Sequence, residues 1–233
     1  MLAKIRNIAL RKGYVIFNEP YKLNIWGFRS RNEAPNRFDD ELHVFFRVSE
    51  KFLSKWAYFV FKCTTDPGTY WLRNPLHPQG TAMLAANQYL DTYKIDKHRG
   101  KYYALCQRLQ EVEVIRDYNR DALLDFYNGR SDKGMHGINI HRARKTGTTY
   151  TVDNHSAGCQ VFQKASEFNQ FMKLCEEHKR RHGNAFSYTL IDKRQEFRSR
   201  LKRITIGLVS AGILTTAYWL VNKYQEQMLT ASK

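Results

Sequence analysis

A histidine and a cysteine lie eighteen positions apart in GINIHRARKTGTTYTVDNHSAGCQVF, residues 137–162. His141 follows the apolar residues INI, and Cys159 ends the sequence SAGC before a second apolar run. A thiolate attacks carbonyl carbons well, but it needs a lowered pKa or a neighbouring base. An imidazole at hydrogen-bonding distance can act as that base and later protonate the leaving amine. The pair therefore indicates acyl-transfer chemistry, if two adjacent strands bring His141 and Cys159 side by side.

The residues around this pair leave alternatives open. Gly158 lacks a Cβ atom, so SAGC can form a tight turn that lets substrate approach the backbone, and such turns present N–H donors to an oxyanion. His136 and His155 compete with His141 for the role of base. A hairpin that carries an incidental histidine and cysteine explains the same spacing without catalysis.

The order of these residues resembles the signature of the L,D-transpeptidase catalytic domain, in which a histidine and a loop precede Ser or Thr, any residue, Gly and Cys. The resemblance extends over about residues 20–191. It implies a β-sandwich-like fold that cleaves or remakes peptide bonds of peptidoglycan stems through an acyl-thioester. It also implies that Cys159 is the nucleophile, that His141 is the base, and that Ser156 and Gly158 shape the turn. The amides of Gly158 and Cys159 are then the candidate oxyanion-hole donors.

Further upstream, TTDPGTYWLRNPLHPQGTAML, residues 64–84, is similar to the Thr/Pro/Gly segment on the family's cleft strands. Two positions depart from the pattern. Ala157 stands where the family has a histidine, and Val161 stands where it has an arginine that organises the site and engages substrate. The choice between transpeptidase, carboxypeptidase and endopeptidase therefore stays open. The segment also resembles bacteriophage-encoded cell-wall-lytic proteins, which favours a hydrolase over a cross-linking transferase.

The elements that must position this pair are mostly strands. Alternating or continuous apolar runs, separated by turn residues such as the DPG at 66–68, predict short strands. One helix is expected over residues 165–183, with Ser166 as its N-cap and Cys175 on its apolar face. We therefore predict a mostly β fold, an L,D-transpeptidase-like β-sandwich with one or two helices. The strands are expected at residues 21–30, 41–49, 55–65, 68–72, 80–84, 102–109, 112–118, 137–143, 157–162 and 186–191.

The C-terminal part of the sequence predicts a membrane segment. Residues 204–221 carry no charge, and at about 1.5 Å per residue they just reach the length that spans a bilayer. Basic residues precede this segment, and Tyr218 and Trp219 lie near its end. The predicted organisation is a basic N-terminal segment (1–19) with a possible amphipathic helix over 2–12, a catalytic domain (20–191), a basic helical connector (192–203), a transmembrane helix (204–221) and a short tail (222–233).

The net charge of +16 and pI of about 9.7 predict a surface that attracts polyanions. Peptidoglycan is the expected partner. Residues 204–221 are expected to anchor the chain in a lipid bilayer, where the chain can also form homo- or hetero-oligomers. Nucleic acid is not expected as the main partner, because no zinc knuckle or RNA-binding signature is present.

The four cysteines form no CxxC pair and are too few for a disulfide scaffold, which argues against structural zinc and a disulfide-based fold.

Residues 117–125, DYNRDALLD, have the oxygen ligand spacing of a calcium loop. Asp117, Asn119, Asp121 and Asp125 occupy positions 1, 3, 5 and 9 of an EF-hand-like pattern. Ala122 replaces the usual glycine, and the bidentate glutamate at the last position is absent. The segment predicts a possible structural calcium ion, with a solvated turn as the alternative. No cofactor is expected for catalysis.

Together these features favour a membrane-anchored cysteine peptidase or acyltransferase acting on peptidoglycan, as a phage lysis or virion-associated enzyme. The alternatives are a non-catalytic, basic, membrane-attached virion protein and a membrane-tethered nucleic-acid binder. The expected location is the host inner membrane or the membrane of a lipid-containing virion. Basic residues before the membrane segment would keep residues 1–203 on the side of synthesis, away from peptidoglycan. Three arrangements would still give these residues access to peptidoglycan: an anchored enzyme that stays inactive until lysis, an inverted orientation, or a location in the membrane of a virion.

Overall fold

The computed structural model describes residues 1–51, 55–127, 129–199 and 201. The chain divides into two compact units, Met1–Asp192 and Lys193–Lys233. In the second unit, residues 193–199 are helical, within the expected connector 192–203. The predicted membrane segment 204–221 and the tail lie outside the described residues. In the part of the chain that the structure describes, no helix is long and apolar enough to cross a bilayer.

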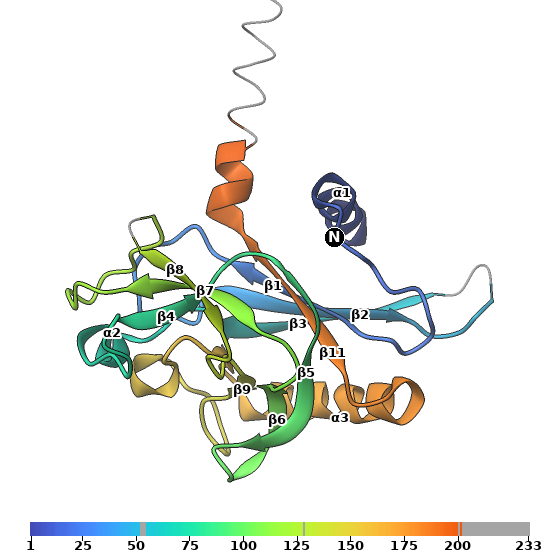
Figure 1. Ribbon diagram of the computed structural model, residues 1–233. Coiled ribbons are helices and arrows are strands. Elements are labelled where there is room, and N and C mark those ends of the chain that lie inside the picture. Colours follow the sequence, from blue (N-terminus) through green and yellow to red (C-terminus); the bar gives the residue numbers. More distant parts are fainter. Residues whose placement is uncertain (52–54, 128, 200, 202–233) are drawn as a thin grey trace, which may run out of the picture. The chain divides into compact units, whose positions relative to one another are not determined.

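Eight strands of the first unit form a closed barrel (Figure 1). The β1–β11 and β9–β10 pairs are parallel, and the other neighbours are antiparallel. The predicted β-sandwich is therefore wrong. Strand β1 pairs with both β2 and β11, so the sheet joins end to end and leaves no free edge. Around the barrel the strands are β1 (Asn24–Arg29), β11 (Phe186–Asp192), β5 (Gln88–His98), β6 (Tyr102–Gln107), β9 (Ile140–Arg142), β10 (Gln160–Phe162), β3 (Trp56–Thr64) and β2 (Asp40–Arg47).

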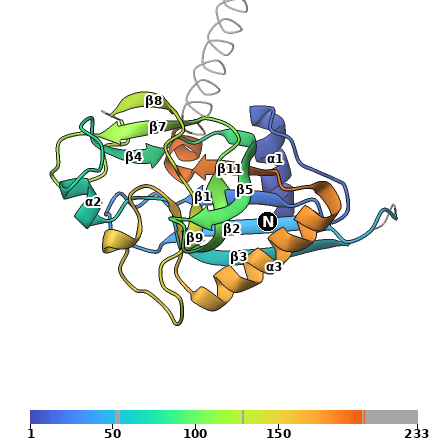
Figure 2. The same cartoon turned by 60° about the horizontal axis from the view of Figure 1, so that its bottom comes forward.

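A second, antiparallel sheet lies to one side of the barrel (Figure 2). It contains β4 (Thr81–Leu84), β7 (Val112–Asp117) and β8 (Arg130–Gly134). Helix α2 (Thr69–Arg73) lies next to β4 in both views and contacts the 3₁₀ helix η1 (Asp153–His155). The strand predicted at 68–72 is therefore wrong. This sheet and α2 frame one side of the segment that carries Cys159.

Two further helices cover apolar surface of the barrel. Helix α3 (Ala165–His182) follows β10 directly, and its Phe168, Phe171 and Cys175 are buried in the main core. Its N-cap is Lys164, ahead of the predicted Ser166. Helix α1 (Leu2–Lys12) matches the amphipathic helix expected over 2–12, and its buried residues pack in a second cluster with Trp26. Among the described residues of 20–191, the α-helices are α2 and α3, and α1 is the additional helix expected at the N-terminal segment.

Candidate active site

Cys159 lies directly before β10, beside the parallel strand β9 that carries His141. The register pairs Gln160 with Ile140 and Val161 with His141. Successive side chains of a strand point to opposite faces, and Ile140 belongs to the barrel core. His141 and Cys159 therefore lie on the other face of the wall, two positions apart along neighbouring strands. The two residues therefore lie on adjacent, paired strand segments.

The thiol of Cys159 differs in exposure from the other three cysteines. Cys63, Cys106 and Cys175 are fully buried, whereas Cys159 is partly exposed. Its Sγ lies 3.6 Å from the carbonyl of Gly137 and accepts a hydrogen bond from the N–H of Asn139 at 3.4 Å. Burial raises the pKa of the Cys159 thiol, against the opposing effects of the Asn139 hydrogen bond and the Arg99 charge. The resting site therefore holds a neutral thiol at neutral pH.

Alkylation of Cys159 should follow from this raised pKa. Iodoacetamide reacts with the thiolate, so the rate should be low at pH 7 and rise about tenfold per pH unit to beyond the ordinary thiol pKa of about 8.5. Mass spectrometry of the modified peptide between pH 6 and 10, with a short unstructured cysteine peptide as control, measures this profile. A rate that levels off below the control's midpoint would show a thiolate–imidazolium pair and contradict the neutral resting state.

The imidazole of His141 is held in the form of a base. Its Nδ1 lies 2.9 Å from the carbonyl oxygen of Arg142, and Tyr102 donates to the same oxygen at 3.2 Å. A carbonyl only accepts, so Nδ1 carries the proton and Nε2 keeps its lone pair. Burial lowers the pKa of His141 to about 3, and the neighbouring His98 acts in the same direction. His141 is thus neutral and only weakly basic in the resting structure, with a fixed tautomer in which Nε2 carries the lone pair.

The competing histidines are less suited to this role. His136 uses both ring nitrogens, since Nδ1 accepts from Arg116 at 3.1 Å and Nε2 donates to the carbonyl of Asp132 at 3.3 Å. His155 ends η1, and neither it nor His141 lines the cavity that Cys159 lines, so the pairing of β9 with β10 is what favours His141 over His155. Although both His141 and Cys159 are described, no hydrogen bond joins them. Proton transfer therefore requires a side-chain rotation, as is common when catalytic contacts tighten only with substrate bound.

A second histidine, which the sequence did not single out, stacks on His141. The rings of His98 and His141 lie 4.1 Å apart at 23°. The N–H of Gln107 donates to Asn139 Oδ1 at 2.9 Å, which directs the amide nitrogen of Asn139 to His98 Nδ1 at 3.0 Å. Neutral His98 therefore carries its proton on Nε2, and burial lowers its pKa to about 4. The sequence around His98, DKHRGK, indicates only a turn between strands, so no local signal marks this residue.

The SAGC turn has an internal hydrogen-bond system. Ser156 is fully buried, and its Oγ donates to the carbonyl of Cys159 at 2.8 Å while accepting from the Gly158 amide at 3.2 Å. The Gly158 amide is thus engaged inside the turn. The Cys159 amide makes no hydrogen bond within the described part of the chain. Of the two expected oxyanion donors, only Cys159 N–H is uncommitted.

The turn opens on a cavity of about 530 Å³. Ala157 and Cys159 line one wall, and Thr81 and Ala82 of β4 line another. Val161, by contrast, is fully buried in an apolar cluster with Phe38. An arginine at position 161 would therefore place an unpaired charge among apolar side chains, whereas Ala157 leaves open space in the cavity. The two departures from the L,D-transpeptidase pattern thus have different structural settings.

The candidate calcium residues are partly engaged with one another. Asp117 is fully buried, its Oδ2 accepts from the N–H of Asp125 at 3.1 Å, and burial raises its pKa to about 6. Asp121 accepts from the N–H of Leu123 at 2.8 Å and from the Asn119 amide at 3.0 Å. Within the described ranges, no group of three or more His, Cys, Asp or Glu side chains is placed to hold a metal ion. Calcium binding stays a prediction.

Comparison of this chain with protein-family models, with curated proteins and with solved structures finds no match.

Proposed function

We propose that this chain is a cysteine peptidase or acyltransferase that acts on the stem peptides of peptidoglycan through a thioester acyl-enzyme. One observation carries the chemistry: the partly exposed Cys159 lines a cavity, and the neutral His141 lies on the adjacent parallel strand with Nε2 unprotonated. The substrate class rests on the resemblance of the His141 spacing and the Ser-x-Gly-Cys turn to L,D-transpeptidases. A hydrolase is favoured over a cross-linking transferase.

The reaction begins when His141 Nε2 accepts the proton of the Cys159 thiol and the thiolate attacks the peptide carbonyl carbon. The oxyanion of the tetrahedral intermediate lies where the Cys159 N–H can donate to it. Collapse of the intermediate breaks the C–N bond, and imidazolium His141 protonates the leaving amine. Water then attacks the thioester, which releases the carboxylic acid and restores the thiol. An amine acceptor in place of water would give transpeptidation.

The test is the release of muropeptides from purified sacculi. The full chain is incubated with sacculi, and soluble products and remaining cross-links are identified by mass spectrometry. We expect peptides cut at stem-peptide bonds, with no change in the glycan strands. If sacculi are unchanged under conditions where the protein is folded and bound, the proposed activity is wrong and a non-catalytic structural role is favoured.

Replacement of His141 tests whether this histidine is the general base. His141→Ala should lower the rate of muropeptide release by about 10²–10⁴-fold, the usual contribution of a general base. His136→Ala and His155→Ala should retain the wild-type rate within a small factor, and circular dichroism of each variant controls for folding. Loss of activity in either of these variants, together with activity in His141→Ala, would reassign the base.

A further inference from the structure

The charged side chains that line the cavity beside Cys159 are all positive. Arg99, Arg108 and Arg116 line it, together with three histidines, and no aspartate or glutamate does. Nearby cations at the edge of a low-dielectric cavity attract an anionic group and hold it in a defined place. The charge of the cavity therefore selects for ligands with negative charge.

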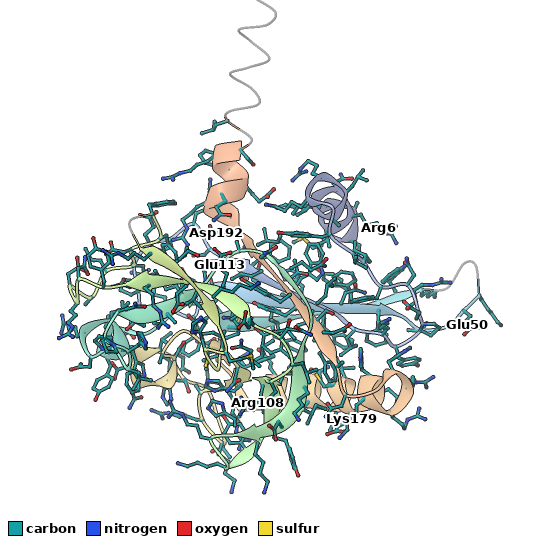
Figure 3. All side chains as sticks on the ribbon, in the orientation of Figure 1. Arg6, Glu50, Arg108, Glu113, Lys179 and Asp192 are labelled. Carbon is teal, nitrogen blue, oxygen red and sulfur yellow. The ribbon has the colours of Figure 1, made fainter. Side chains whose placement is uncertain are left out.

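Two of these arginines already have carboxylate partners. Arg116 is bonded to Asp132 through Nε at 3.0 Å and Nη2 at 2.7 Å. Arg108, which follows β6 and is labelled in Figure 3, is bonded through Nε to Asp96 at 3.1 Å. No hydrogen bond or ion pair of Arg99 is found among the described residues. Arg99 is thus the guanidinium of the cavity whose charge has no neutralising carboxylate there.

The backbone of Arg99 is held by a tight turn. Arg99, Gly100 and Lys101 connect β5 and β6, and Arg99 and Gly100 have φ values of 50° and 71°. These positive angles are typical of a type I′ hairpin turn, and the N–H of Lys101 closes it by donating to the carbonyl of His98 at 3.0 Å. The same turn therefore positions His98, which stacks on the base, and Arg99 at the cavity.

We infer that Arg99 binds a free carboxylate of the substrate next to the scissile bond, so that the enzyme acts on stem peptides with an unamidated carboxylate there. This inference rests on the proposed function. Guanidinium groups form paired, charge-assisted hydrogen bonds with carboxylates. The charge of Arg99 also acts on the pKa of Cys159 and of His141, which shows that it lies within electrostatic range of the reacting groups. The resemblance to L,D-transpeptidases implies an arginine at position 161, where this chain has Val161. Arg99 on the β5–β6 turn supplies a cation near Cys159 instead.

The experiment measures binding, so that it does not depend on turnover. Isothermal titration uses the Cys159→Ala chain and the tetrapeptide L-Ala-γ-D-Glu-meso-diaminopimelate-D-Ala. Further titrations use forms of this peptide in each of which one carboxylate is a carboxamide. The same peptides are titrated into the Cys159→Ala chain that also carries Arg99→Gln, Arg99→Lys or, as a control of equal charge change on α3, Arg180→Gln.

Arg99→Gln should raise the Kd of the parent peptide by about 10- to 100-fold, the range expected for a charged hydrogen-bonding partner. Arg99→Lys should restore part of the affinity, and Arg180→Gln should change nothing. For one carboxamide form, Arg99→Gln should have no additional effect, because the carboxylate that it binds is already absent. Equal weakening of all peptides by Arg99→Gln, an unchanged Kd for the parent, or no detectable binding of the parent would overturn the inference.

The two proposals fail separately. If the wild-type chain cuts sacculi in a Cys159-dependent manner but Arg99→Gln binds the parent peptide normally, only the role of Arg99 is wrong. If the wild-type chain cuts no sacculi while the Arg99-dependent discrimination between carboxylate and carboxamide is observed, the proposed reaction is wrong and the carboxylate site remains.

Discussion

Cys159→Ala is expected to abolish the release of muropeptides from sacculi, with a loss of at least about 10⁴-fold. In the proposed reaction the thiol forms the covalent intermediate, and no neighbouring side chain can take its place. The hydroxyl of the same turn, Ser156 Oγ, is fully buried and bonded to the carbonyl of Cys159. Because Cys159 lines the cavity, loss of its thiol leaves a small void at the cavity wall and should preserve the fold.

The matched control for this variant is Cys175→Ala, which removes a fully buried thiol from α3. It should lower stability by about 1 kcal/mol through the small void that it leaves, and it should keep the wild-type activity. Intact-protein mass spectrometry during turnover should also detect a thioester adduct in the wild-type chain and none in Cys159→Ala. Activity retained in Cys159→Ala, with muropeptides of the same kind, would show that a different group performs the chemistry.

The local elements could be predicted from the sequence, because local patterns determine them. Alternating apolar residues place β1, β2 and β3 within one or a few residues of their observed bounds. The period of the apolar residues similarly gives α3, and the polar loop between β9 and β10 leaves room for parallel pairing. The prediction fails at α2, where the aromatic residues of GTYWL have strand propensity but pack as one helical turn beside η1. It also omits two observed strands, β5 and β8.

Closure of the barrel could not be predicted in this way. It depends on the pairing of β1 with β11, whose partners Ile25 and Tyr188 lie at opposite ends of the barrel sequence. No local pattern encodes such a contact. For the same reason a sandwich and a barrel, which share the same alternating strands, cannot be distinguished from the sequence alone.

The candidate site shows the same division between local and long-range information. The His141 spacing and the SAGC turn are local, and both are visible in the sequence. His98 and Arg99 reach the cavity from a hairpin turn that precedes His141 by about forty residues, and only the β6–β9 pairing brings that turn near. Asn139, which orients His98, is visible in the sequence only as part of an apolar strand. The electrostatics of the cavity are therefore a property of the tertiary fold.

Gly158→Ala is expected to destabilise the fold strongly. A Cβ at this position would lie 2.0 Å from the carbonyl oxygen of Ala82 on β4, and the backbone φ of Gly158 is +115°. The substitution therefore combines backbone strain of about 1–3 kcal/mol with overpacking of about 1–3 kcal/mol, so we expect a loss of roughly 2–6 kcal/mol. Urea unfolding followed by tryptophan fluorescence gives the change in the free energy of unfolding.

Gly147→Ala separates the two contributions. Gly147 also has a positive φ, +73°, but nothing lies within 4 Å of a Cβ built there. Its substitution should cost only the strain of a left-handed residue, about 1–2 kcal/mol. The difference between the two losses in the free energy of unfolding then measures the energetic cost of the close contact between the SAGC turn and β4. Equal losses for Gly158→Ala and Gly147→Ala would show that β4 moves aside at little cost. A larger loss for Gly158→Ala would show that the second sheet holds the Cys159 turn in place, which ties the position of the nucleophile to the packing of that sheet.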